Sequence, residues 1–292
     1  MTRSGSDRVG IADVAREAGV SKAAVSFAFN RPERLSAETA ARIHDVAARL
    51  GYRPSPVARM LTAGATGTIG ILSPQALGTI FANPFFALFS EGVASVSEER
   101  GLGLLFISPL HGSLRRAIDR ATVDGIVAVG LDERHPEVGA VRDAGLPVVL
   151  VDAPAWPEHG SVGVDDEGGA AAAARHLLGL GHRTFLVISV EPPAYGEPLA
   201  ESVAGARLRG YRDALAAEGV TLPDDAVIPS PATFEAGEQT FLRAWSDGLR
   251  PTAVLSMSDA AAAGVVQAAR TLGLRVPDDL SVVGYDDLPL RS

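Results

Sequence analysis

The chain has 292 residues, of which 47% are hydrophobic and 21% are charged. This length and composition predict two or three packed domains and exclude wholesale disorder. The absence of cysteine excludes disulfides, thiolate chemistry and cysteine-ligated zinc.

No apolar run reaches the roughly 20 residues that a membrane-spanning helix requires, so no membrane partner is expected. Residues 1–7 are polar and lack the apolar core of a secretion signal. We therefore expect a cytoplasmic protein.

The charge is distributed unevenly along the chain. Residues 1–61 contain 10 Arg/Lys and 6 Asp/Glu, whereas residues 62–292 contain 16 and 29. A basic segment ahead of an acidic body suggests a module that binds a polyanion. Chance is the alternative, because an excess of four positive charges over about sixty residues is modest.

Three short helices are predicted in this basic segment. Apolar residues at helical spacing predict a helix over residues 11–19, and Ser21 is a suitable N-cap for a second helix over residues 22–29. Ser36 precedes a third helix over residues 37–50, which Gly51 ends. Two helices joined by a tight turn form a helix-turn-helix, so the segment fits a DNA-binding headpiece. An ordinary three-helix bundle is the alternative.

Several short motifs extend this interpretation to the whole chain. They occupy residues 13–15, 18–21, 25–30, 51–54, 83–86, 123–126, 164–169, 180–183, 207–211 and 276–287. In this order and spacing they resemble the LacI/GalR family of bacterial transcriptional regulators. The resemblance implies a helix-turn-helix headpiece followed by a core like the periplasmic binding proteins.

The resemblance places the second helix in the major groove of DNA. Residues at its exposed positions would contact base edges or phosphates. The base-edge candidates are Lys22, Ala23 and Phe27, and the phosphate candidates are Ser21, Ser26 and Asn30. Phe27 departs from the family, where arginine is common, and its ring can only contact a thymine methyl group or pack inside the headpiece.

Residues 54–66 form the predicted hinge after a headpiece of residues 1–53. Ser55 and a following proline suit a helix start, but two turns are too short to be stable alone. The resemblance implies that this helix folds on operator DNA and pairs across a dimer, with Ala58 and Leu61 in the minor groove. Leu61 would wedge between base steps. A plain linker is the alternative.

The remaining chain alternates between apolar runs and helical segments. The expected strands are residues 69–72, 104–107, 126–129, 148–151, 185–188, 254–255 and 282–283. The expected helices include residues 85–100, 169–180, 204–218, 235–247 and 260–272. This order predicts a doubly wound α/β body with parallel sheets. By resemblance, it divides into effector-binding subdomains at residues 67–157 and 158–292.

Ligands of such sheets bind beyond the carboxyl ends of the strands. The effector-binding candidates there are Ser73, Asp152, Ser258 and Asp286. By resemblance, Arg207 reaches into the same cleft, and Phe85 and Phe86 could supply an apolar face at its mouth. For Arg207 and Asp286 the alternative is a structural ion pair, and for the two phenylalanines it is a place in the core. Asp and Arg can together bracket a polyhydroxyl ligand.

Enzyme motifs are missing from the sequence. Lys22 is the only lysine, so no Walker A lysine is possible, and no dinucleotide fingerprint, nucleophile elbow or metal-binding histidine pair occurs. We expect no catalytic residue, cofactor or metal. Asp165 and Asp166 are expected to cap the following helix, and His182 is expected to cap a helix end.

Together these features predict a homodimeric, effector-responsive transcriptional regulator, most simply a repressor. Its partners would be a pseudopalindromic DNA operator and a small molecule such as a sugar or a related polar metabolite. Relatives continue for several tens of residues beyond the motif that ends at residue 287, so we expect either a truncated or a short member of the family. The alternatives are a sugar-binding protein without DNA function and a truncated, inactive regulator.

Overall fold

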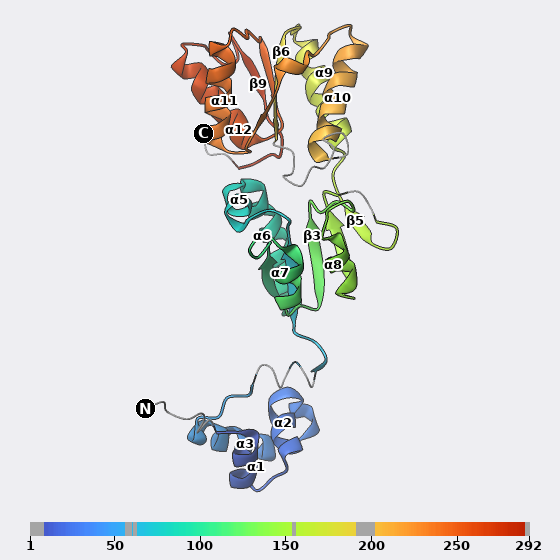
Figure 1. Ribbon diagram of the computed structural model, residues 1–292. Coiled ribbons are helices and arrows are strands. Elements are labelled where there is room, and N and C mark those ends of the chain that lie inside the picture. The colour runs from blue at the N-terminus through green and yellow to red at the C-terminus, as the bar shows by residue number, and fades with distance from the viewer. Residues whose placement is uncertain (1–8, 56–59, 61–62, 154–155, 191–201, 290–292) are drawn as a thin grey trace, which may run out of the picture. The chain divides into compact units, whose positions relative to one another are not determined.

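The computed structural model describes residues 9–55, 60, 63–153, 156–190 and 202–289. The chain forms two compact units, residues 1–66 and residues 67–292 (Figure 1). No helix among the described residues is long and apolar enough to cross a lipid bilayer.

The first unit contains the predicted helices. They are α1 (Ile11–Ala18), α2 (Lys22–Asn30) and α3 (Ala37–Leu50), with a 3-10 turn at Pro32–Arg34. Ser21 Oγ accepts a hydrogen bond from the Ala24 N–H at 3.1 Å, and Ser36 Oγ accepts one from the Thr39 N–H at 3.2 Å. Gly51 ends α3 in the left-handed region at φ 67°. These caps fix where the chain turns between helices.

A small apolar core holds the three helices together. Val14, Val25 and Ile43 are fully buried, one from each helix. The Phe29 ring packs edge-on against His44, with ring centroids 4.7 Å apart. Val25 and Phe29 thus turn one side of α2 toward the core of the headpiece, and the opposite side of the helix is available to a partner.

The second unit begins with a parallel five-stranded sheet in the order β2-β1-β3-β4-β5. Its strands are β1 (Thr68–Leu72), β2 (Gly103–Ile107), β3 (Gly125–Val129), β4 (Val148–Val151) and β5 (Gly160–Val162). Its helices are α5 (Leu77–Ala82), α6 (Pro84–Glu99), α7 (Leu114–Arg120) and α8 (Val138–Asp143). Residues of α5 and α6 pack on one face of the sheet, and those of α7 and α8 on the other.

A second parallel sheet follows in the order β7-β6-β8-β9. Its strands are β6 (Phe185–Val190), β7 (Val227–Ser230), β8 (Ala253–Ser256) and β9 (Ser281–Val283). Helices α9 (Asp166–Gly179) and α10 (Val203–Ala217) pack on one face, while α11 (Phe234–Ser246) and α12 (Asp259–Thr271) pack on the other (Figure 1). A helical headpiece followed by two α/β subdomains, each with a parallel sheet, is the predicted fold class.

Several short elements of the body are absent from the sequence prediction. They are β5, β7, α5, α7 and α8. β5 has only three residues, all exposed, and β7 contains Pro229, so neither has the apolar run of a buried strand. Because β5 pairs with β4, the first sheet continues past the predicted subdomain boundary at residue 157.

Two glycines let the helices of the second sheet approach closely. A Cβ on Gly210 would clash with the carbonyl oxygen of Glu167, so α10 lies against the start of α9. A Cβ on Gly264 would likewise clash with the carbonyl oxygen of Phe234, where α12 crosses α11. The approach at Gly210 also brings Arg207, which lies one turn earlier in α10, to Asp166, the first residue of α9.

Candidate DNA-binding surface and effector cavity

The outer face of α2 carries the residues predicted to bind DNA. Lys22, Ala23 and Asn30 are exposed, while Ser26 and Phe27 are half-buried. They share one side of the helix because their spacing follows its period. A cation, a small residue and amide and hydroxyl groups thus form one continuous surface.

Two hydroxyl groups of this surface already take part in local hydrogen bonds. Ser21 Oγ caps α2, and Ser26 Oγ accepts a hydrogen bond from Asn30 Nδ2 at 3.3 Å. Each serine hydroxyl keeps a hydrogen that it could donate to a phosphate oxygen. Ala58 and Leu61, the two predicted minor-groove residues, lie outside the described residues.

Phe27 contacts an arginine that the sequence analysis missed. The Arg34 guanidinium carbon lies 5.4 Å from the centroid of the Phe27 ring, within the range of a cation–π interaction. Arg34 belongs to the 3-10 turn after α2 and is exposed. The stack places a positive charge beside the position where the family commonly has arginine.

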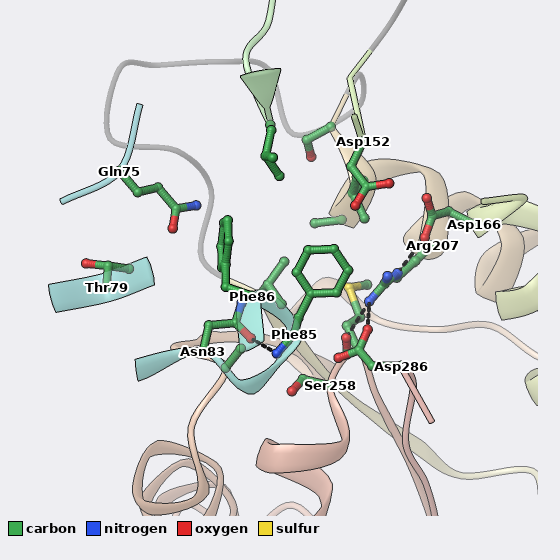
Figure 2. A pocket seen from close by; sticks show the side chains of 18 of the residues that line it. Gln75, Thr79, Asn83, Phe85, Phe86, Asp152, Asp166, Arg207, Ser258 and Asp286 are labelled. Atoms are coloured by element: carbon green, nitrogen blue, oxygen red, sulfur yellow. Dashed lines mark hydrogen bonds and ion pairs between the residues drawn. The ribbon is translucent and has the colours of Figure 1, made fainter. Parts of the chain in front are cut away.

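The second unit contains a cavity of 730 Å³ at the carboxyl ends of strands from both sheets. Six predicted effector residues line it: Phe85, Phe86, Asp152, Arg207, Ser258 and Asp286. Residues that line it and that the prediction omitted include Gln75, Thr79, Asn83, Asp132 and Asp166. Figure 2 shows Asp166, Arg207 and Asp286 together on one side of the cavity and Gln75 and Thr79 on the opposite side.

Ser73 is the predicted effector residue that does not line the cavity. It is 1% exposed, and its hydroxyl oxygen accepts a hydrogen bond from the Gln75 N–H at 3.3 Å. The hydroxyl therefore orders the turn after β1, and the next polar side chain, Gln75, reaches the cavity instead.

Arg207 is the centre of the polar side of the cavity. Its Nε donates to Asp166 Oδ1 at 2.8 Å, and its Nη1 donates to the Met257 carbonyl oxygen at 2.5 Å. Nη1 also lies 3.5 Å from Asp286 Oδ1. The guanidinium carbon is 3.7 Å from the centroid of the Tyr285 ring, so one face of the group is covered. The predicted alternative, a structural ion pair, is thus present, with Asp166 as the nearer carboxylate.

Asp152 follows β4 in a conformation that a non-glycine residue rarely adopts. Its φ is 49°, in the left-handed region. Burial raises the pKa of its carboxyl group, and the negative charge of Asp166 raises it further. Among the described residues the carboxylate has no hydrogen-bond or ion-pair partner. Such an unfavourable placement of a charge is typical of binding sites.

Asp286 follows β9 and is also held in an unusual backbone conformation, with φ 103°. Burial raises the pKa of its carboxyl group to about 6, against the opposing effect of the Arg207 charge. The desolvation of this carboxylate is therefore only partly offset by the arginine.

The apolar wall of the cavity comes from the start of α6. Phe86 is 6% exposed and belongs to the core beneath the first sheet, whereas Phe85 is half-buried. Their rings meet edge-on with centroids 5.6 Å apart. Asn83 Oδ1 accepts a hydrogen bond from the Phe85 N–H at 3.1 Å and so fixes the helix start. Phe86 thus serves the core and Phe85 offers more surface to a ligand.

Ser258 adds an unpartnered polar atom to this lining. It is 2% exposed, and its Oγ has no hydrogen-bond partner within the described part of the chain, although it occupies the N-cap position of α12. A buried hydroxyl without a partner loses its hydration free energy without compensation. A ligand in the cavity could supply the missing hydrogen bond.

Two expectations outside the cavity have different outcomes. Asp165 caps α9, since its Oδ1 accepts a hydrogen bond from the Gly168 N–H at 2.9 Å. His182 does not act as a helix cap through its ring: Nδ1 lies 3.0 Å from Thr252 Oγ1 and Nε2 lies 2.9 Å from Ser281 Oγ. It therefore ties the segment before β6 to the residue before β8 and to the first residue of β9.

Comparisons with known proteins decide the family. A model described as bacterial regulatory proteins, lacI family, matches residues 10–55, and a periplasmic binding protein-like domain matches residues 174–291. The ribose operon repressor of Escherichia coli (strain K12) is 31% identical over 287 residues, which cover 96% of this chain and 83% of that protein. The chain belongs to the LacI family. It is a DNA-binding transcriptional regulator with a periplasmic-binding-protein-like effector domain.

Other members of the LacI family agree over nearly the same length. The HTH-type transcriptional regulator IpsA of Corynebacterium glutamicum is 32% identical over 94% of this chain and 82% of that protein. A lac repressor dimer bound to operator and the anti-inducer ONPF is 28% identical, with a TM-score of 0.77 over 97% of this chain and 84% of that one. A CelR–cellobiose complex has a TM-score of 0.65 and is 28% identical over 96% of this chain and 84% of that one. These are regulators rather than enzymes, as the sequence predicts.

The raised pKa of Asp286 predicts how the empty protein responds to pH. Between the ordinary value of 3.8 and about 6 the folded state binds more protons than the unfolded state. The free energy of unfolding should therefore fall as pH rises through this window, by about 2–3 kcal/mol at most for this group. Above the window this group causes no further change. Chemical unfolding at several pH values, followed by the fluorescence of Trp156 and Trp245, measures the effect.

The control for this prediction is Asp286→Asn, which cannot ionise. The variant should lack this part of the decline, so the difference in unfolding free energy between variant and wild type should grow in favour of the variant from pH 4 to pH 6. A difference that is constant with pH would contradict the prediction.

Proposed function

We propose that this chain is a homodimeric repressor whose affinity for a pseudopalindromic operator is set by a sugar or a related polar metabolite bound in the cavity. The observation that carries the proposal is the presence, in one chain, of an exposed polar face on α2 and of a separate cavity with incompletely satisfied polar groups. A DNA-binding switch requires both. Operator DNA lies in the bacterial cytoplasm, where we place the protein.

The headpiece, residues 1–53, supplies the contacts to DNA in this proposal. The exposed side of α2 enters the major groove, with Lys22, Ala23 and Phe27 toward the base edges. Ser21, Ser26 and Asn30 contact phosphates. The hinge, residues 54–66, pairs with that of a second subunit, where Ala58 and Leu61 reach the minor groove. The lac repressor dimer bound to its operator supports this arrangement by similarity.

The cavity supplies the contacts to the effector. Arg207, Asp152, Asp286 and Ser258 offer charged and hydroxyl groups to a polar ligand, while Phe85 offers an apolar surface. The names of the ribose operon repressor and of the CelR–cellobiose complex support a sugar. A ligand that contacts residues of both sheets favours one arrangement of the two subdomains, and so shifts the fraction of protein that is competent to bind DNA.

Selection of binding sites from a random pool of duplex DNA tests the proposal. The full chain should enrich an inverted repeat whose two half-sites are each protected in footprinting, because a two-fold dimer reads two equal half-sites. Protection should change when a metabolite that stabilises the core is added. Failure to enrich any site at low salt would refute the proposed function.

Arg34 provides a test of the stack on Phe27. If the stacked guanidinium contacts DNA, Arg34→Ala should weaken binding to the selected site by roughly 10-fold, the loss expected for one arginine contact. Arg42→Ala is the matched control, because it removes an exposed arginine from α3 rather than from the α2 surface. Binding is measured by titration of labelled duplex. Equal losses for the two variants would assign Arg34 only a general electrostatic role.

Leu61 provides a test of the minor-groove wedge. Leu61→Ala should weaken binding to the selected site far more than binding to random duplex, because only the bent complex uses the wedge. Bending of the site, measured by energy transfer between dyes at its two ends, should decrease in parallel. Met60→Ala is the control for a general effect of truncating an apolar side chain in the hinge. Equal weakening of specific and random binding would rule out the wedge.

A further inference from the structure

The charges of the cavity are unbalanced around Arg207. Asp152, Asp166 and Asp286 stand on the same side as this single arginine, which pairs with Asp166 and Asp286, so the four side chains together carry a net charge of −2 when all three carboxyl groups are ionised. Arg209 also lines the cavity, but it is exposed and its Nε donates to Glu167 at 3.2 Å. Among the described lining residues, therefore, both arginines are already ion-paired with carboxylates.

Two of the three nitrogen atoms of the Arg207 guanidinium group already donate to the protein. Nε and Nη1 donate to Asp166, Met257 and Asp286, and Tyr285 covers one face of the guanidinium group. A bidentate arginine–phosphate contact requires two donors that point together at the ligand. Here such a contact would have to displace a buried carboxylate, which would then lose its own partner.

Helix N-termini are the other usual source of anion binding, because their N–H groups are free and the helix dipole is positive there. Several of them line the cavity, and in three of them one N–H near the start donates to a side-chain cap: Asn83 caps α6, Ser202 caps α10 and Thr233 caps α11. The start of α5 also lines the cavity and has no side-chain cap, but this helix has only six residues. The start of α12 carries Asp259 in its first turn. Side-chain oxygen acceptors therefore stand at the starts of α6, α10, α11 and α12, where they compete with an anionic ligand.

The two lining groups that lack partners can both accept hydrogen bonds, and one of them, the Ser258 hydroxyl, can also donate. The Asp152 carboxylate has no partner among the described residues, and the buried Ser258 Oγ has none. Both face the cavity (Figure 2). A carboxylate can only accept hydrogen bonds, so its complement is a ligand that donates them, as hydroxyl groups do. Ser258 is an independent sign of a ligand site, since its hydroxyl is buried and has no hydrogen-bond partner among the described residues.

We propose that the cavity binds the uncharged, unphosphorylated form of a hydroxyl-rich effector and rejects its phosphorylated and carboxylated forms. This inference rests on the proposed function, which makes the cavity the effector site. It adds that the regulator distinguishes the two states of one metabolite by charge.

Matched sugars test the inference on the full-length protein. The panel is D-ribose with D-ribose 5-phosphate, D-glucose with D-glucose 6-phosphate and D-gluconate, and cellobiose with its 6′-phosphate. Thermal melting finds the sugars that bind, and calorimetry gives their affinities. We expect at least one free sugar to bind, and its charged counterparts to bind at least about 100-fold more weakly, because like charges are brought together in a partly buried site.

Asp152→Asn identifies the source of the selectivity. It removes one negative charge while keeping the shape of the side chain, so the ratio of affinities for the free and phosphorylated sugar should fall by about 10-fold. Its melting temperature without ligand should equal or exceed that of the wild type, because the carboxylate is unpartnered, and this separates loss of selectivity from loss of folding. Asp225→Asn, the same change at an exposed residue outside the cavity lining, should leave the ratio unchanged.

The remaining outcomes distinguish this inference from the proposed function. A phosphorylated or carboxylated sugar that binds as well as its free form would overturn the inference and leave the effector role of the cavity intact. If no member of the panel shifts the melting temperature, the assignment of the cavity to a sugar fails, and the inference fails with it.

Discussion

The effector domain depends on one buried arginine. Arg207 joins the first residue of α9, the carbonyl of Met257 after β8 and the carboxylate of Asp286 after β9. These segments are far apart in the sequence, and the close approach of α10 to α9 at Gly210 makes the contact possible. Removing either Arg207 or Asp166 would leave a buried charge without its partner, a change that typically costs several kcal/mol. The network therefore fixes the polar side of the cavity before any ligand arrives.

The cavity combines several unfavourable features of its own side chains and backbone. Asp152 and Asp286 adopt left-handed or neighbouring backbone conformations, burial raises the pKa of both carboxyl groups, and Ser258 has an unsatisfied hydroxyl. A folded protein tolerates such strain only where the surroundings enforce it. A ligand that donates hydrogen bonds to these groups would recover part of that free energy on binding. Stability of the empty domain is thus exchanged for affinity, the usual compromise at a functional site.

The sequence predicted most strongly those features that local rules govern. Ser21, Ser36 and Gly51 set the helix ends of the headpiece through contacts within a few residues, and the buried strands follow from short apolar runs. Features that depend on distant residues were not predictable in this way. Asp166 looks like a helix cap in the sequence, but its partner is Arg207, 41 residues away. Arg34 lies in a turn without periodicity, and only the folded headpiece reveals its contact with Phe27.

The repulsion between the cavity carboxylates suggests how the cavity communicates with DNA under the proposed function. Asp152 follows a strand of the first sheet, whereas Asp166 begins a helix of the second, and the charge of Asp166 raises the pKa of Asp152. Like charges on the two subdomains oppose their approach when the cavity is empty, while a ligand whose hydroxyl groups donate to both would favour it. The free energy of ligand binding is then coupled to the arrangement of the subdomains. Because such coupling is reciprocal, operator DNA must change the affinity for the effector by the same factor as the effector changes the affinity for DNA.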